Sequence, residues 1–281
     1  MTGDDDPLCG AAVPMRQREG KDKMNSDQVV VQRVSPGVLL IRINRPEVRN
    51  ALNLHVRSVI AAQLAAASED VETRCIVITG DQVAFAAGAD IREMENLGAI
   101  EHMQTGTFMT WTAISSCTKP VIAAVNGFAM GGGFELALAA DIIIAGKSAR
   151  FALPEVRIGV MPGGGGTQKL MRLIGKHRAM KYCLTGASFS GEEAFAMGVA
   201  SEVVEDAFVV NRALEMASTI AGFAPLAVQQ IKEVLLAGQD VPLATALRLE
   251  SKATQVLFAS RDKMEGMKAF MEKRQPVWEG R

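Results

Sequence analysis

The chain has 281 residues, of which 48% are apolar, 22% are charged and only 5% are aromatic. These values exclude collagen-like, disordered and disulfide-scaffold proteins, and the length suits one large domain or two small ones. The 30 basic and 31 acidic residues leave a formal net charge of -1, so no overall positive field attracts a phosphate backbone. Nucleic acid is therefore a poor default partner.

The cysteines and the apolar stretches bear on the cellular compartment. Four cysteines are scattered without a C-x-x-C pair, which suits a reducing compartment. The longest apolar stretch, residues 121 to 134, is shorter than the about 20 residues that a membrane helix needs. The N-terminus carries Asp4, Asp5 and Asp6 and shows no targeting signal. We therefore expect a cytoplasmic protein without a membrane span.

The N-terminal third of the chain begins with a polar stretch and continues with alternating elements. Residues 1 to 27 have no apolar period and are predicted to be a disordered tail. Strands at residues 29–31 and 38–43 flank Ser35-Pro36-Gly37, a turn tripeptide, and predict a hairpin. An amphipathic helix over residues 52–67 and an aliphatic strand over residues 75–79 follow.

The same alternation continues toward the middle of the chain. Helical stretches are predicted over residues 106–116 and from about residue 133, and strands over residues 121–125 and 142–145. Strands that alternate with helices favour an α/β fold with mostly parallel strands. We assign residues 28–205 to this core, which ends with a possible short strand at residues 200–204.

Residues 206–281 are predicted to form a C-terminal helical region. Pro225 suits the first turn of a helix over residues 226–237, and residues 243–258 carry apolar side chains on one face. These helices either pack on the sheet and cover the active site or form an oligomer interface, and periodicity does not distinguish the two arrangements.

Several common chemistries lack their motifs. His55, His102 and His177 stand far apart with no metal-ligand spacing, so we expect no metal site. The glycine-rich stretch at residues 163–166 fits no G-x-x-x-x-G-K-[ST] register, and Gly131-Gly132-Gly133 fails G-x-G-x-x-G. Neither ATPase activity nor a dinucleotide cofactor is predicted.

Three segments of small residues follow buried strands and end in polar side chains. They are residues 85–90, residues 126–135 and residues 151–159. A glycine N–H at a helix N-terminus can donate to a developing oxyanion. Glu135 and Glu155 have apolar neighbours, and burial would raise their pKa values and make them an acid–base pair. The residues alone somewhat favour the alternative, in which each glutamate is a solvated cap.

These motifs in their order resemble the enoyl-CoA hydratase (crotonase) family. The similarity is carried by residues 44–52, 87–91, 119–137, Asp141, 154–159, Pro162, 165–167 and the closing residues 272–276. It runs from about residue 28 to Arg281. The resemblance implies a spiral of β-β-α turns with a C-terminal helical region, assembled as a homotrimer or as a dimer of trimers.

The resemblance also implies a substrate held as a coenzyme A thioester. Its carbonyl oxygen would lie between the backbone N–H groups of Ala89 and Gly132. The coenzyme A cleft would involve Ala51, Ala87, Ala89, Asp90, Ile91, Arg92 and Gly132, and Lys273 would reach the nucleotide phosphates, from this or a neighbouring subunit. No cofactor is implied beyond the coenzyme A of the substrate.

Because both glutamates are present, the resemblance favours a hydratase that adds water across a 2,3-double bond. Glu135 would activate the water and Glu155 would supply the proton to the α-carbon. A Δ3,Δ2-enoyl-CoA isomerase, another crotonase-type acyl-CoA lyase, and a non-enzymatic acyl-CoA or RNA binding protein stay open as alternatives.

Two residues depart from the family pattern. Phe134 is bulkier than the residue expected before the first glutamate, and Gly164 stands where alanine is common. Both are expected to alter the acyl pocket. Met94, Leu97, Phe108, Met109 and Trp111 fall in the region that shapes this pocket, although such residues are more often part of a core.

Overall fold

The structure is a computed structural model that describes residues 28–105 and 107–281, and the side chains of residues 107–109 are not among the described ones. The tail predicted for residues 1 to 27 and the side chains of Phe108 and Met109 lie outside the described part.

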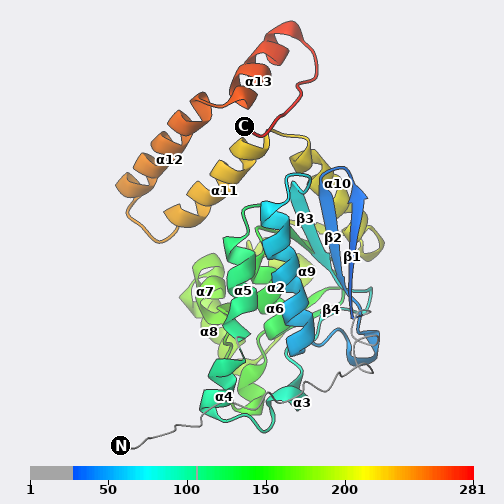
Figure 1. Cartoon of the computed structure of the whole chain (residues 1–281). Coiled ribbons are helices and arrows are strands. Elements are labelled where there is room, and N and C mark those ends of the chain that lie inside the picture. Colours follow the sequence, from blue (N-terminus) through cyan, green and yellow to red (C-terminus); the bar gives the residue numbers. More distant parts are fainter. Residues whose placement is uncertain (1–27, 106) are drawn as a thin grey trace, which may run out of the picture.

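A six-stranded sheet forms the centre of the molecule (Figure 1). The sheet order is β1 (Val29–Ser35), β2 (Val38–Ile43), β3 (Cys75–Thr79), β5 (Val121–Val125), β7 (Ile142–Gly146) and β10 (Glu202–Val204). Only β1 and β2 pair antiparallel, which confirms the predicted hairpin, and the other neighbours are parallel. Strands β3 and β5 are buried along their whole length, which explains why their sequences are continuous aliphatic runs.

The residue patterns did not predict a second sheet of four short strands, although the family resemblance implied two strands in each turn. Its order is β4 (Ala84–Ala86), β6 (Phe128–Met130), β8 (Arg150–Ala152) and β9 (Phe189–Ser190). The first three strands coincide with stretches that the sequence analysis describes as loops of small residues. They are three residues long, so no period can reveal them, and pairing with other strands makes them extended. Each large-sheet strand β3, β5 and β7 is thus followed by a small-sheet strand, which confirms the predicted spiral of β-β-α turns.

Helices cover both faces of the large sheet. On one side lie α2 (Leu54–Glu69), α5 (Thr107–Ser116) and α6 (Gly132–Ala139), and α10 (Val209–Ala221) packs on the other. The first core contains Ile60, Ile78 and Phe134, whereas the second joins Ala213 of α10 to Val77. The remaining elements are η1 (Pro46–Val48), α3 (Ile91–Met94), α4 (Ala99–Gln104), η2 (Glu155–Ile158), α7 (Gly166–Ile174), α8 (Lys176–Thr185), α9 (Gly191–Ala196) and η3 (Asp206–Phe208).

Phe134, which was expected to alter the acyl pocket, belongs to this core and is not exposed in a pocket. Its ring is fully buried and packs against Phe151 at 5.2 Å and against Phe189 at 5.6 Å between ring centroids. The large side chain therefore fills the space between α6 and the second sheet.

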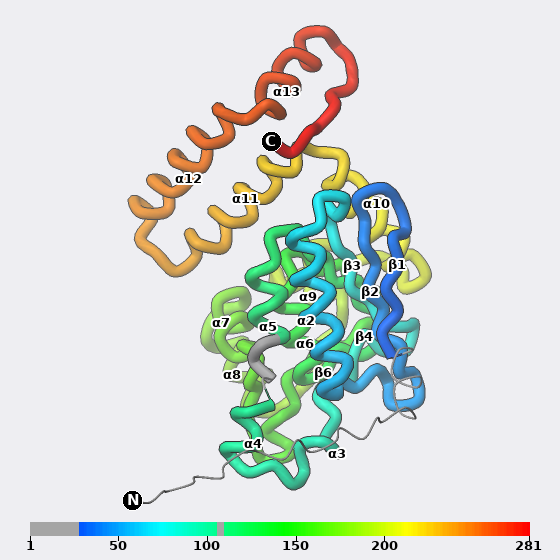
Figure 2. The backbone as a smooth tube through the Cα atoms, in the orientation of Figure 1, coloured from blue at the N-terminus to red at the C-terminus, as the bar shows by residue number. Residues whose placement is uncertain are grey.

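The last three helices, α11 (Pro225–Gly238), α12 (Leu243–Phe258) and α13 (Arg261–Glu272), form an arm that projects from the core (Figure 2). We call them the C-terminal arm. Lys232 of α11 is buried and anchors the arm, because its Nζ lies 2.7 Å from Asp141 Oδ2 and donates to the Lys119 carbonyl at 2.9 Å. The Trp278 indole donates to the Gly222 carbonyl at 2.7 Å and ties the chain end back to the core.

Among the described residues, no single helix has the length and apolarity to cross a membrane. Residues 206–221 and Pro225–Gly238 pass such a test only as a pair bent by 111°, and the α10 part of this pair packs on the sheet.

Candidate active site

The first part of the candidate site is the segment that leaves β4. Gly88 has a φ of +109°, and a Cβ there would lie 3.0 Å from the Met130 carbonyl oxygen, so only glycine suits this position. Leu52 N–H donates to the Gly88 carbonyl at 2.7 Å, and Asp90 N–H donates to the Leu52 carbonyl at 3.2 Å. Because successive amides of an extended segment point in opposite directions, the Ala89 N–H faces away from Leu52.

The second part is the entry into α6, which follows β6. Gly131 has a φ of +50°, and Gly132 opens the helix, where an amide has no intrahelical acceptor. A Cβ on Gly132 would lie 3.5 Å from the Ala89 nitrogen, so the two backbone segments are neighbours. The structure thus brings together the two amides that the sequence analysis assigned to one oxyanion site.

Glu135 lies one turn into α6 and is 3% exposed. Its Oε1 accepts hydrogen bonds from the backbone N–H groups of Gly164 at 2.7 Å and Gly166 at 2.8 Å. Burial raises the pKa of Glu135, and the two N–H donors offset part of this effect because they stabilise the carboxylate. The Lys169 ammonium favours the charged form in the same way.

Glu155 begins η2, directly after β8 and Pro154. Burial is the main cause that raises the pKa of Glu155 to about 7, and the negative charge of Glu135 raises it further. Its Oε2 is buried and has no hydrogen-bond partner among the described residues. A Cβ on Gly131 would lie 2.8 Å from Glu155 Oε1, so the missing side chain at Gly131 makes room for this carboxyl group. The two glutamates, 20 residues apart in sequence, therefore lie in one site.

Trp111 of α5 is a further residue of the site. The sequence analysis placed it in the region that shapes the acyl pocket but did not predict its contacts with Gly132 and Gly164. The indole is 4% exposed, and its Nε1 has no partner among the described residues. A Cβ on Gly164 would lie 2.6 Å from two indole ring atoms, and a Cβ on Gly132 would lie 3.6 Å from a third. Trp111 thus packs between Gly132 at the start of α6 and the loop at residues 164–166, whose N–H groups bind Glu135. The glycine at position 164 is the sequence signal that could have indicated this contact.

The predicted coenzyme A residues fall into two groups. The first group lies near Ala89. Four of its members are close to Ala89 in sequence, namely Ala87, Asp90, Ile91 and Arg92, and Ala51 is brought near by the bridge between Leu52 and Ala89. Lys273 follows α13 at the end of the C-terminal arm, away from α3, which holds Ile91 and Arg92 (Figure 1). Within one chain the structure does not bring Lys273 to this site.

Comparison with known proteins agrees with this arrangement. The family model for enoyl-CoA hydratase/isomerase matches residues 33–281. The 2,3-dehydroadipyl-CoA hydratase of Escherichia coli is 41% identical over 244 residues, which cover 87% of this chain and 96% of that protein. The short-chain-enoyl-CoA hydratase of Clostridium acetobutylicum is 39% identical over 240 residues, which cover 84% and 92%.

Solved structures are similar over the same range. The crystal structure of an enoyl-CoA hydratase from Bacillus anthracis superposes with a TM-score of 0.87 at 36% identity, and the match covers 90% of this chain and 100% of that chain. The described chain therefore belongs to the enoyl-CoA hydratase/isomerase family.

Proposed function

We propose that this protein is a 2-enoyl-CoA hydratase that adds water across the 2,3-double bond of an enoyl-CoA thioester. The observation that carries the proposal is the pair Glu135 and Glu155 beside the amides of Ala89 and Gly132. Family membership and the names of the similar hydratases support the same reaction.

The thioester carbonyl oxygen accepts hydrogen bonds from the N–H groups of Ala89 and Gly132. Negative charge grows on this oxygen as water attacks the β-carbon, so the two donors bind the transition state more strongly than the substrate. One such donor is typically worth about 10²–10³ in rate.

The surroundings of the two carboxyl groups support different roles. Two N–H donors and Lys169 stabilise the charged form of Glu135 against the effect of burial, which suits it to be the base that takes a proton from water. Glu155, with a pKa raised to about 7 and one unpartnered oxygen, carries a proton and donates it to the α-carbon. Hydroxide adds to the β-carbon, and the proton left on Glu135 returns to Glu155 through the next water.

The coenzyme A part of the substrate is proposed to lie along Ala51, Ala87 and the segment Ala89–Arg92. Lys273 would contact the nucleotide phosphates of a neighbouring subunit in a homotrimer or a dimer of trimers. The reaction needs no cofactor beyond this coenzyme A. A cytoplasmic location is supported by the free cysteines Cys75, Cys117 and Cys183.

The test is the loss of the conjugated thioester absorbance of crotonyl-CoA with wild type, Glu135→Gln and Glu155→Gln. Each variant should lose about 10²–10⁴-fold in kcat while staying folded. Glu69→Gln, at an exposed position at the end of α2, is the matched control and should keep full activity. Conversion of a 3-enoyl to a 2-enoyl thioester without hydration would make the protein an isomerase instead.

A further inference from the structure

The position of the Ala89 amide depends on how the segment of residues 88–90 is held. Its backbone pairs with Leu52 through only two hydrogen bonds, 2.7 and 3.2 Å long, as an isolated bridge outside the named strands. Ala87 N–H adds one bond, at 3.0 Å, to the Arg49 carbonyl. So few backbone bonds leave the direction of the Ala89 N–H dependent on side chains.

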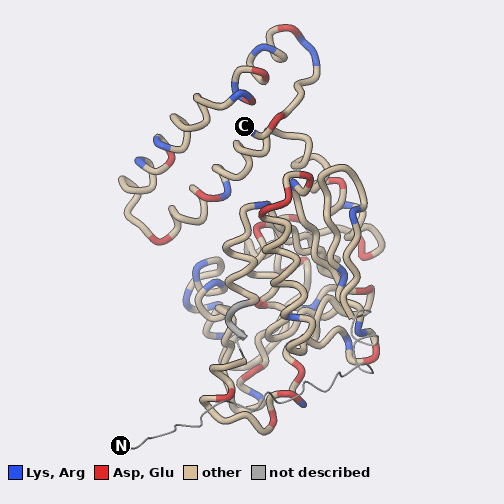
Figure 3. Tube along the Cα trace, in the orientation of Figure 1, with Lys and Arg blue, Asp and Glu red and all other residues tan. Residues whose placement is uncertain are grey.

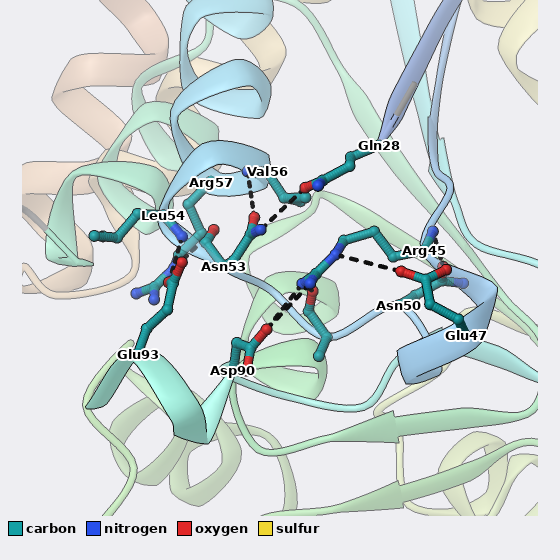
Figure 4. Close-up of polar contacts among 11 residues, drawn as sticks. Gln28, Arg45, Glu47, Asn50, Asn53, Leu54, Val56, Arg57, Asp90 and Glu93 are labelled. Atoms are coloured by element: carbon teal, nitrogen blue, oxygen red, sulfur yellow. Dashed lines mark hydrogen bonds and ion pairs between the residues drawn. The ribbon is translucent and has the colours of Figure 1, made fainter. Parts of the chain in front are cut away.

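Arg45 supplies such a side chain, because it binds the neighbours of the two bridge residues: Ala51, which precedes Leu52, and Asp90, which follows Ala89 (Figure 4). Its Nη1 donates to the Ala51 carbonyl at 2.6 Å, and Nη1 and Nη2 donate to Asp90 Oδ2 at 3.1 and 3.2 Å. The Arg45 side chain is 11% exposed and that of Asp90 is 16% exposed. Because most of both side chains is buried, salt screens this ion pair weakly, and its charge-assisted hydrogen bonds fix its geometry.

The base of Arg45 is itself fixed. Its backbone N–H donates to Asn50 Oδ1 at 2.8 Å, and the fully buried Asn50 side chain donates to the Ala84 carbonyl at 2.7 Å. The chain from β4 through Asn50 and Arg45 to Asp90 therefore forms one connected network around the segment that carries Ala89. Glu93 adds an exposed contact farther along, since its Oε2 accepts from the Leu54 N–H at 2.8 Å.

We propose that Arg45 is a positioning residue for the oxyanion site: its guanidinium, held between the Ala51 carbonyl and the Asp90 carboxylate, sets the direction of the Ala89 N–H. This inference rests on the proposed function, in which Ala89 donates to the thioester oxygen. The role differs from substrate binding, because Nη1 and Nη2 both donate to protein acceptors and the remaining nitrogen, Nε, is buried.

The first measurement is the steady-state kinetics of Arg45→Met with crotonyl-CoA. A displaced oxyanion donor weakens the transition state more than the bound substrate, so kcat should fall about 10–100-fold with KM changed less than about threefold. Arg33→Met is the matched control. Arg33 also binds one backbone carbonyl, that of Glu72, and one carboxylate, that of Asp70, but at the far end of α2, so this variant should keep wild-type kcat.

The second measurement follows the carbonyl polarisation directly. A bound dimethylaminocinnamoyl-CoA absorbs at longer wavelength when hydrogen bonds polarise its thioester carbonyl. Arg45→Met should bind this probe with a smaller red shift than wild type, which a loss of stability alone would not produce. Asp90→Asn, which keeps the shape but removes the charge, should show an intermediate red shift and an about 3–10-fold lower kcat, and it serves as the readout if Arg45→Met does not fold.

In the double variant Arg45→Met with Asp90→Asn, the loss of kcat should be smaller than the two single losses combined, because both substitutions break the same contact. A full red shift together with wild-type kcat in Arg45→Met or Asp90→Asn would overturn the proposal. So would a raised KM at unchanged kcat, which would assign Arg45 to coenzyme A binding. Absence of hydration by wild type would instead overturn the proposed function, so the two failures are distinguishable.

Discussion

At the residue scale, the two carboxyl groups of the site differ in what surrounds their charge. Glu135 receives two backbone N–H groups, whereas Glu155 has a buried oxygen without a partner. In the proposed mechanism, the same residue type therefore serves as a base at one position and as an acid at the other.

This difference predicts how activity depends on pH. Glu155 must be protonated to donate, and its pKa is about 7, so kcat/KM for crotonyl-CoA should fall about tenfold per pH unit well above pH 7. In Glu155→Gln the residual activity should lose this descending limb. A pH–rate profile of both proteins between pH 6 and about 9 tests the assignment, and an unchanged limb in the variant would contradict it.

The raised pKa has a stability consequence of defined sign. Folding raises the pKa of Glu155, so the folded state holds its proton more tightly, and this contribution is complete below about pH 4.5 and is lost as the pH rises to about 7. This loss of stability is therefore nearly complete at about pH 7, where the predicted loss of activity begins.

Gly164 and Trp111 form the second residue-scale pair with a testable consequence. Gly164→Ala would place a Cβ 2.6 Å from indole ring atoms, so the indole or the loop must move. Overpacking of this kind typically costs about 1–3 kcal/mol. We expect this loss in thermal unfolding, together with a lower kcat, because Gly164 N–H binds Glu135.

A smaller side chain at position 111 should restore the space. The double variant Gly164→Ala with Trp111→Leu should be more stable than the sum of the two single effects predicts. If the two single changes in the free energy of unfolding simply add in the double variant, the contact with Trp111 is not what excludes a side chain at position 164.

At the element scale, the C-terminal arm depends on one buried ion pair. Lys232 is 8% exposed and bonds both the Asp141 carboxylate and the Lys119 carbonyl, which lie at the starts of β7 and β5. Asp141 Oδ2 also accepts from the Val121 N–H at 2.7 Å, so it keeps one partner if the lysine is removed.

Lys232→Met should therefore destabilise the protein by about 3 kcal/mol, at the lower end for a broken buried pair. Urea unfolding measures this loss, and limited proteolysis should cut α11 faster in the variant. Lys252→Met, at an exposed position of the same arm, should change the free energy of unfolding by less than about 0.5 kcal/mol. Equal effects of the two substitutions would argue against the anchor.

At the scale of the whole molecule, charged and apolar surfaces are distributed unevenly. Basic residues gather on α7 and α8 (Figure 3), although the net charge of the chain is only -1. Large apolar side chains are exposed along the C-terminal arm, namely Ile231, Leu235, Leu236, Leu243, Leu247, Leu249, Val256, Phe258, Met264, Met267, Phe270 and Met271. Such a surface is typical of a protein–protein interface.

The proposed homotrimer predicts a mass of three times 30.0 kDa, or six times for a dimer of trimers. Leu235→Glu combined with Phe270→Glu should shift sedimentation toward the monomer, because the two side chains are 66% and 86% exposed in the single chain. Gln255→Glu adds a charge to an exposed position of the arm without removing apolar surface and should leave the mass unchanged. A wild-type monomer at micromolar concentration would contradict the proposed assembly.

The sequence by itself determined the order of the large-sheet strands along the chain, the hairpin, the helices α2, α5, α6, α11 and α12, and the identity of the two glutamates. Aliphatic runs, turn residues and the helical period are local signals, and a reactive side chain is visible wherever it stands. The family resemblance added the pairing of Ala89 with Gly132, which no spacing could have supplied.

Only the tertiary structure decided the pairing of the second sheet, the contacts of Glu135 with the amides of Gly164 and Gly166, and the ion pair between Arg45 and Asp90. These features join residues 29 to 45 positions apart, or strands of three residues, so no period records them. They arise because a buried carboxylate, a guanidinium or an extended backbone must find its hydrogen-bond partners among whichever groups the packed chain brings close.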